Sequence, residues 1–297
     1  VHTWQAAFLL VALPGLVCLA LMLTVREPPR SDRARPTAEP APPLREVARF
    51  LWLRRRTIGA IYVGFALLAA MQFGLGAWVA SFFVRTHGYT LSQIGTVFGL
   101  YYMTLGTAGV VSGGWLSDRL SRAGRLDANL LTGVIAGTCA LPFVVSFPLV
   151  ADDRLALWLL APATFFGTMP FGAGTAALPL LAPNRMRGLV VALYLVVANL
   201  LGQAVGPTYV AVLTDFVFRD PLQLRWSIAV ACGSLLVLAI AAIASGLRHV
   251  GAALASAGEA DTASAPRAPE PPRPEAPAPA TRAATHTAAA PDGAAHG

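Results

Sequence analysis

The stretch that decides the fold is GWLSDRLSRAGR, residues 114–125, a short charged segment between two long apolar runs. It brings one Asp and three Arg together, at Asp118, Arg119, Arg122 and Arg125, in a connection too short to fold on its own. We expect a connection of this kind to be a tight turn at a membrane surface, where it joins two membrane spans and does mechanical work.

The composition of the chain indicates a polytopic membrane protein. Of its 297 residues, 56% are hydrophobic and 12% are charged, whereas a soluble domain carries about 25% charged residues. A net charge of +7 would suggest a nucleic-acid partner in a soluble protein. Here the charge is explained by Arg in membrane-flanking loops, so we expect the lipid bilayer as a partner and no nucleic acid.

Seven apolar runs are long enough to span a bilayer, which takes about 20 residues. They cover residues 5–25, 57–84, 92–116, 128–149, 155–182, 188–214 and 226–247. The expected fold is therefore all-α, with seven transmembrane helices. Residues 26–56 form an Arg- and Pro-rich linker, and residues 248–297 form an Ala- and Pro-rich tail that we expect to be disordered.

The end of the linker, Leu44–Arg56, predicts an amphipathic helix. Two interpretations of this helix stay open. One is a solvated linker that carries positive charge on one side of the membrane, which we favour, and the other is a helix that binds specific lipids.

The distribution of arginine predicts the orientation. Eighteen of the 22 Arg lie in the linker, in loops 117–127 and 183–187, and in the tail, whereas the opposite side holds four. The positive-inside rule places the Arg-rich side and the C-terminus in the cytoplasm, and we expect the inner membrane of a bacterium. Val1 is not Met, and the first span starts almost at once. Either Val1 translates an alternative start codon, or the chain is a fragment or a truncated reading frame, which we favour.

The charged stretch resembles the signature loop of the major facilitator superfamily, G-x-L-x-D-R-x-G-R-R. The matching residues are Gly114, Leu116, Asp118, Arg119 and Arg122. Ser121 replaces the Gly of the family, and Ala123 replaces the final Arg. Imperfect copies are typical of the second half of the family, between helices 8 and 9. If the stretch joins helices 8 and 9, then helices 6 and 7 should precede these two and helices 10 to 12 should follow them. The chain has spans for all of them.

Two further segments are similar to bacterial spinster-like transporters of this superfamily. The first span resembles their sixth helix, which shows W-R-x-x-F, a P-G pair and R-E-P. The matching residues are Trp4, Phe8, Pro14, Gly15, Arg26, Glu27 and Pro28, and Gln5 replaces the usual Arg. Residues 183–207 are similar to the eleventh helix. The chain then corresponds to helix 6 (residues 1–25), the central linker and a six-helix second half (residues 57–247).

The resemblance implies a secondary transporter that works by alternating access. Two halves rock around a central cavity, driven by an ion gradient that is often one of protons. The implied partners are a small organic or lipid-like molecule and a missing N-terminal half. In the family, the charged loop meets the other half, so Asp118 and Arg119 would lack those contacts in this chain alone. Within the chain, Asp118 would cap a neighbouring helix, and the Arg side chains, with Arg125, would meet carboxylates or terminal carbonyls.

Helices 7, 8, 10 and 11 of such a half would line the cavity, and polar residues at membrane depth are often functional. The candidates for the substrate path are Gln72, Tyr101, Asn199 and Gln203, and Tyr102 lies beside them. Asn199 and Gln203 lie four residues apart and share one helix face. For them we favour function, and for the two tyrosines we favour helix packing.

The run 155–182 is rich in residues that weaken helices. Gly167, Pro170, Gly172, Gly174 and Pro179 predict an interrupted helix that supplies a hinge. Close packing of small residues is the alternative. Packing is also what we predict for the two G-x-x-x-G pairs, Gly95/Gly99 and Gly109/Gly113.

No Asp, Glu or His lies in the middle of a span. If the whole protein couples transport to protons, the coupling carboxylate belongs to the missing half, and this chain alone does not transport. A retinal protein would need a Lys for its Schiff base, and the chain has none. We expect no enzyme, cofactor or metal site, because no nucleophile–base pair or ligand cluster is seen. A receptor-like or nonfunctional truncated membrane protein remains the alternative.

Overall fold

The protein is described by a computed structural model that covers residues 3–25, 43–182 and 186–264. Nothing in these ranges is a strand; they consist of helices joined by short turns. The helices are α1 (Thr3–Thr24), α2 (Leu44–Leu53), α3 (Arg55–His87), α4 (Leu91–Tyr101), α5 (Thr107–Arg122), α6 (Ala128–Ser146), α7 (Asp153–Leu181), α8 (Arg187–Val212) and α9 (Leu224–Ser264).

Two of the spans contain π-helical turns. The turn η2 (Tyr102–Gly106) joins α4 to α5 in one continuous segment, and η3 (Leu213–Phe218) extends α8. A short 3₁₀ turn, η4 (Pro221–Gln223), precedes α9. Within the described residues, six segments are long and apolar enough to cross a membrane. The apolar, 22-residue α1 precedes them, so the all-α, polytopic fold is confirmed.

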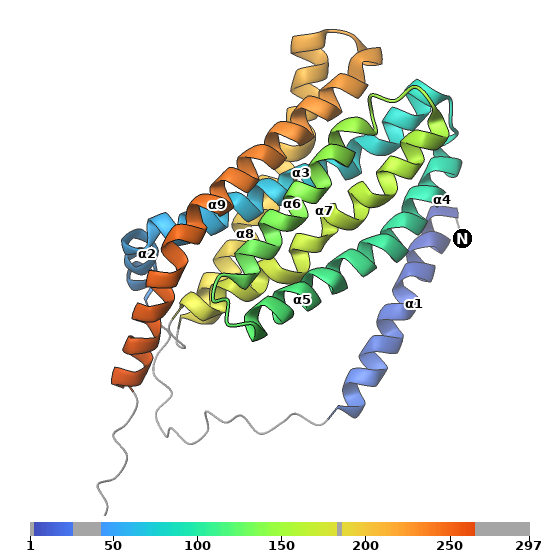
Figure 1. The fold of residues 1–297 in the computed structure, drawn as a ribbon. Coiled ribbons are helices and arrows are strands. Elements are labelled where there is room, and N and C mark those ends of the chain that lie inside the picture. Colours follow the sequence, from blue (N-terminus) through green and yellow to red (C-terminus); the bar gives the residue numbers. More distant parts are fainter. Residues whose placement is uncertain (1–2, 26–42, 183–185, 265–297) are drawn as a thin grey trace, which may run out of the picture.

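The packing divides the bundle into two similar units, α3–α4–α5–α6 and α7–α8–α9. The first helix of each unit packs on the last two spans of the other: α3 contacts α8 and α9, while α7 contacts α5 and α6. The last helices, α6 and α9, also pack on each other. Internal structural repeats are typical of transporter folds. Figure 1 shows this bundle with α1 lying beside it.

Glycines set the distance between the helices of these pairs. A Cβ on Gly113 of α5 would lie 2.0 Å from the Met169 carbonyl oxygen of α7, and a Cβ on Gly172 of α7 would lie 2.1 Å from the Val110 oxygen of α5. The pair of α3 and α8 repeats the arrangement, because a Cβ on Gly206 would lie 2.1 Å from the oxygen of Ala70. The backbones therefore touch. Helices in lipid associate through such close packing, because apolar side chains gain little free energy when they move from lipid into a helix contact.

The two G-x-x-x-G pairs differ in their surroundings. Gly109 and Gly113 pack against α7 as predicted. Positions Gly95 and Gly99 have no atom within 4 Å of the place where a Cβ would stand. The packing predicted for Gly95 and Gly99 is therefore not seen among the described residues.

The predicted interruption of the run 155–182 is also wrong. The helix α7 is continuous from Asp153 to Leu181, through Gly167, Pro170 and Gly174. A break at membrane depth would expose backbone groups to lipid, and the small residues instead admit neighbouring helices. A Cβ on Gly174, for example, would lie 2.6 Å from the Phe65 ring. The side chains of residues 175–181, Pro179 among them, lie outside the described part.

Candidate functional site

The charged stretch that was predicted to be a loop is mostly helix. Residues 114–122 form the last turns of α5, and only Ala123–Asp127 connect it to α6. The connection turns at Gly124, whose φ of 84° lies in the left-handed region that glycine adopts at little cost. The two spans are therefore joined by a shorter corner than the sequence predicts.

Arg125 and Asp127 hold this corner together. Nε and Nη2 of Arg125 donate to the two carboxylate oxygens of Asp127 at 3.0 and 2.9 Å. This bidentate bond to Arg125 lowers the pKa of the Asp127 carboxyl. Below the corner, the Ser117 hydroxyl of α5 donates to the side-chain oxygen of Asn129 in α6, and both residues are buried.

Asp118 does not cap a neighbouring helix as predicted. It lies inside α5 and is exposed, and its carboxylate makes no hydrogen bond or ion pair with a described residue. The N-cap position of α6 belongs to Asp127 instead. Arg122 donates to the backbone oxygen of Asp118 at 3.3 Å, and the Arg119 guanidinium lies 5.5 Å from the centre of the Trp115 ring. At the connection between α7 and α8, Asn184 lies outside the described part, and Arg187 donates to the oxygen of Ala182 at 3.0 Å.

Among the substrate-path candidates, Gln72 is buried, with 5% of its surface exposed. Its amide nitrogen donates to the Tyr102 hydroxyl at the start of η2. Its Oε1 has no partner in the described structure and faces Gly167, where a Cβ would lie 2.5 Å away. Gln72 therefore joins α3 to η2 and packs so closely against α7 that a glycine is needed there.

The π-helical turn η2 is held from α7 as well. The hydroxyl of Thr168 lies 3.0 Å from the carbonyl oxygen of Gly106, the last residue of the turn. A π turn displaces carbonyl groups from the regular helical pattern, and a hydroxyl from a neighbouring helix offers such a group a partner inside the membrane.

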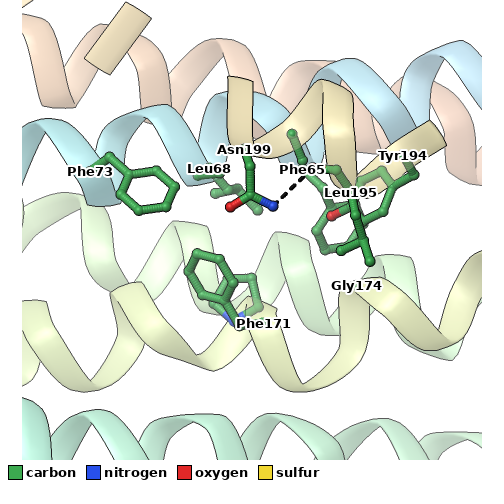
Figure 2. Close-up of a pocket in the computed structure, with 11 residues that line it drawn as sticks. Phe65, Leu68, Phe73, Phe171, Gly174, Tyr194, Leu195 and Asn199 are labelled. Atoms are coloured by element: carbon green, nitrogen blue, oxygen red, sulfur yellow. Dashed lines mark hydrogen bonds between the residues drawn. The ribbon is translucent and has the colours of Figure 1, made fainter. Parts of the chain in front are cut away.

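A cavity of about 120 Å³ opens between α3, α7 and α8. Its lining is aromatic and aliphatic, with the amide of Asn199 and the hydroxyl of Tyr194 as its polar side-chain groups. The lining residues are Phe65, Leu68, Ala69, Phe73, Pro170, Phe171, Gly174, Tyr194, Leu195, Ala198 and Asn199. In Figure 2 the Asn199 amide points into the space between Phe73 and Phe171.

The two polar residues of the cavity, Asn199 and Tyr194, have different neighbours. The amide nitrogen of Asn199 donates to the Leu195 oxygen of its own helix at 2.8 Å, so the side-chain oxygen is left to accept a bond. The Tyr194 ring packs edge-on against Tyr62 at 5.5 Å, and the Tyr62 hydroxyl donates to the Val190 oxygen at 2.7 Å. A small apolar molecule with one donor group would suit such a lining.

The structure thus separates residues that the sequence placed together. Asn199 lines the cavity, whereas Gln203, one turn later on α8, is exposed outside it. Tyr101 packs on the core. The aromatic lining, above all Phe73 and Phe171, was missed because such residues along a span are usually taken as core.

The Major Facilitator Superfamily family model matches residues 1–207. The chain belongs to this superfamily. The charged stretch had predicted it, and the assignment is confirmed. On the assignment that the charged stretch predicts, α3 corresponds to helix 7 of the superfamily, the continuous segment of α4 and α5 to helix 8, and α6 to α9 to helices 9 to 12.

Individual members of the superfamily are similar to the chain in sequence or in fold. An "MFS-type efflux pump" of Mycolicibacterium smegmatis is 29% identical over 220 residues, which cover 73% of this chain and 49% of that protein. The crystal structure of a bacterial homologue of the human lysosomal transporter Spinster, inward-facing and unoccupied, gives a TM-score of 0.56 at 20% identity over 86% of this chain and 60% of its own. Its occupied form gives 0.52 at 21% identity, over 84% and 57%. The chain therefore has the fold of spinster-like members and spans about half the length of these relatives.

Proposed function

We propose that this chain supplies the second half of a secondary transporter for an apolar or amphipathic small molecule. The observation that carries the proposal is the cavity between α3, α7 and α8. In superfamily numbering these are helices 7, 10 and 11, which face the central path. The lining can bind an apolar body, and the Asn199 oxygen can accept one hydrogen bond from it.

The uneven burial of the spans supports a second half that covers this one. In the most apolar stretch of each span, 17% of the residues are buried in Leu91–Arg122 and 22% in Arg187–Phe218, against 44% to 67% in the other spans. These two segments occupy corresponding places in the two repeats. Their exposed faces carry polar residues, among them Thr104, Asn199 and Gln203. Such groups are costly toward lipid, and a protein partner or a water-filled cavity would solvate them.

The end of the bundle that carries the charged corner supports a gating role. We propose that Gly114, Asp118, Arg119, Arg122 and Arg125 brace against the other half on the side where α2 also lies. That side is rich in arginine, so by the positive-inside rule it faces the cytoplasm of a bacterial inner membrane, with the C-terminus there. If protons drive transport, their carrier belongs to the other half.

Photolabelling tests the cavity directly. The chain in lipid nanodiscs is exposed to an apolar probe that carries a diazirine and one hydroxyl group, and the labelled peptides are mapped by mass spectrometry. We expect labels on the peptides of Phe73, Phe171 and Leu195, and about tenfold less labelling there in Asn199→Leu, because one lost hydrogen bond to a bound group costs about 1 to 2 kcal/mol.

The matched control is Gln203→Leu, which makes a similar change one helical turn away, outside the cavity. It should leave the labelling of the cavity unchanged. Labels on the exposed α9 residues Val237 and Leu238 measure the background labelling by probe that is dissolved in the lipid. Cavity labels that do not exceed these lipid-facing labels would overturn the proposed binding site.

A further inference from the structure

The short helix α2 lies directly before the first span of the second half. It ends at Leu53, and α3 begins at Arg55, so Arg54 alone separates them, with φ −104° and ψ 21°. Such angles lie outside the α-helical region and let α2 leave the direction of α3. Because α3 enters the membrane at this point, α2 is held at the membrane surface.

One side of α2 is anchored on the protein. Val47 is 2% exposed and packs in a small cluster with Ala182, Met186 and Val190, at the corner where α7 ends and α8 begins. Phe50 and Leu51 pack against the same cluster. The depth and the rotation of α2 are thus fixed by the bundle.

The opposite side of α2 combines exposed apolar and cationic side chains. Trp52 and Leu53 are 68% and 71% exposed. Arg45 and Arg49 are exposed too, and they share one helix face with Trp52 because they lie at i, i+4 and i+7. Just beyond the end of α2, the Arg55 guanidinium lies 5.1 Å from the centre of the Trp52 ring, and Arg56 is exposed beside it.

This combination of exposed apolar and cationic side chains suits a membrane surface better than it suits water. Exposed Leu and Trp side chains in one short helix would remain in contact with solvent, but Trp is enriched at the level of the lipid head groups. Arginine binds phosphate groups in bidentate fashion, and clusters of basic residues beside a span attract anionic lipid. An amphipathic helix with these two kinds of residue lies in the plane of the interface.

We infer that α2 is a binding site for the head groups of anionic phospholipids. Arg45, Arg49 and Arg56 bind the phosphates, and Trp52 and Leu53 reach the boundary of the acyl chains. The site is built into the bundle through Val47, so bound lipid also holds the corner between α7 and α8 at a fixed depth. Of the two interpretations that the sequence left open for this helix, the structure thus favours the lipid-binding one.

Hydrogen exchange of the α2 amides tests the site. The 297-residue chain is placed in nanodiscs of phosphatidylcholine, or of phosphatidylcholine with phosphatidylglycerol, and exchange over residues 44–53 is compared. A basic residue at an anionic surface favours binding by about fivefold, so three of them should slow exchange on the order of 100-fold in the anionic discs. High salt should remove most of this protection, because it screens charges at the surface.

Two variants with equal losses of charge locate the effect. Arg45→Gln/Arg49→Gln/Arg56→Gln should exchange at the same rate in both kinds of disc. The control Arg85→Gln/Arg154→Gln/Arg225→Gln, made at exposed positions on the other end of the bundle, should keep the protection of the unaltered chain.

The comparison of the two lipid compositions needs no variant, so it stands even if a triple substitution misfolds. Equal exchange in both discs would overturn the inference, since α2 would then be covered by protein or by water alone. Protection by inorganic phosphate in phosphatidylcholine discs would also overturn it, because the site would then bind free anions rather than a lipid surface.

Discussion

The side-chain amide of Gln72 donates a hydrogen bond to the Tyr102 hydroxyl and thereby joins the middle of α3 to the π-helical turn η2. Both groups lie at membrane depth, where an unpaired polar group has no water to bind. The bond links α3 to the continuous segment of α4, η2 and α5, one of the two least buried spans.

Breaking this bond should destabilise the bundle. Tyr102→Phe leaves the Gln72 amide unpaired and should lower the free energy of unfolding by about 1 kcal/mol. Gln72→Leu with Tyr102→Phe removes both partners and should cost less than the two single changes added together. Unfolding of the reconstituted chain in sodium dodecyl sulfate measures all three variants. Additive losses would show that the two side chains do not interact.

The contact between α5 and α7 gives a second prediction. Gly113→Ala places a methyl group where the Met169 carbonyl oxygen is 2.0 Å away, so the helices must separate, at a cost of about 1 to 3 kcal/mol. Gly99→Ala is the matched control, because nothing lies within 4 Å of that site. It should be neutral or stabilise by up to about 1 kcal/mol, since alanine favours helix. The same unfolding assay compares them, and equal effects would disprove the close approach.

The corner between α5 and α6 should respond to pH. Because the pKa of the Asp127 carboxyl is lowered by Arg125, the ion pair stabilises the fold above the ordinary pKa of aspartate. That stability is lost as the pH falls through the lowered value. Half of the Arg125 side chain is exposed, so solvent screens the ion pair and the gain in stability is small.

Asp127→Asn should therefore unfold at a slightly lower concentration of sodium dodecyl sulfate than the unaltered chain at pH 7. Near pH 2 the two should unfold at the same concentration. Asp118→Asn, which removes a carboxylate without a described partner, should not differ from the unaltered chain at pH 7. A loss in Asp127→Asn that persists in acid would mean that the ion pair is not its cause.

Charge and periodicity in the sequence were enough to predict the spans, and the resemblance of the charged stretch to the family signature was enough to predict the superfamily. They were not enough to predict where α5 ends. Asp118, Arg119 and Arg122 are compatible with a helix, so the charges extend α5 until Gly124 turns the chain. A polar stretch between spans was taken as a loop because polarity marks the water boundary, and the helix simply crosses that boundary.

The cavity could not be predicted for a different reason. Phe65, Phe171 and Tyr194 lie on three helices, and nothing in the order of residues shows that these helices meet around a gap. The continuity of α7 is likewise decided by its neighbours, because α5 lies against Gly172 and α3 lies against Gly167 and Gly174, the glycines that would weaken the helix in isolation. Contacts between distant segments, rather than local propensity, decide both features.

Gradient-driven transport in proteoliposomes tests the central claim, that this chain is one half of an alternating-access transporter. The chain is reconstituted alone, a proton gradient is imposed, and accumulation of the apolar probe is followed. The account predicts that the cavity is photolabelled while accumulation stays at the level of protein-free liposomes. Accumulation that depends on the gradient, saturates with probe and falls in Asn199→Leu would contradict it, because the chain would then transport without a second half.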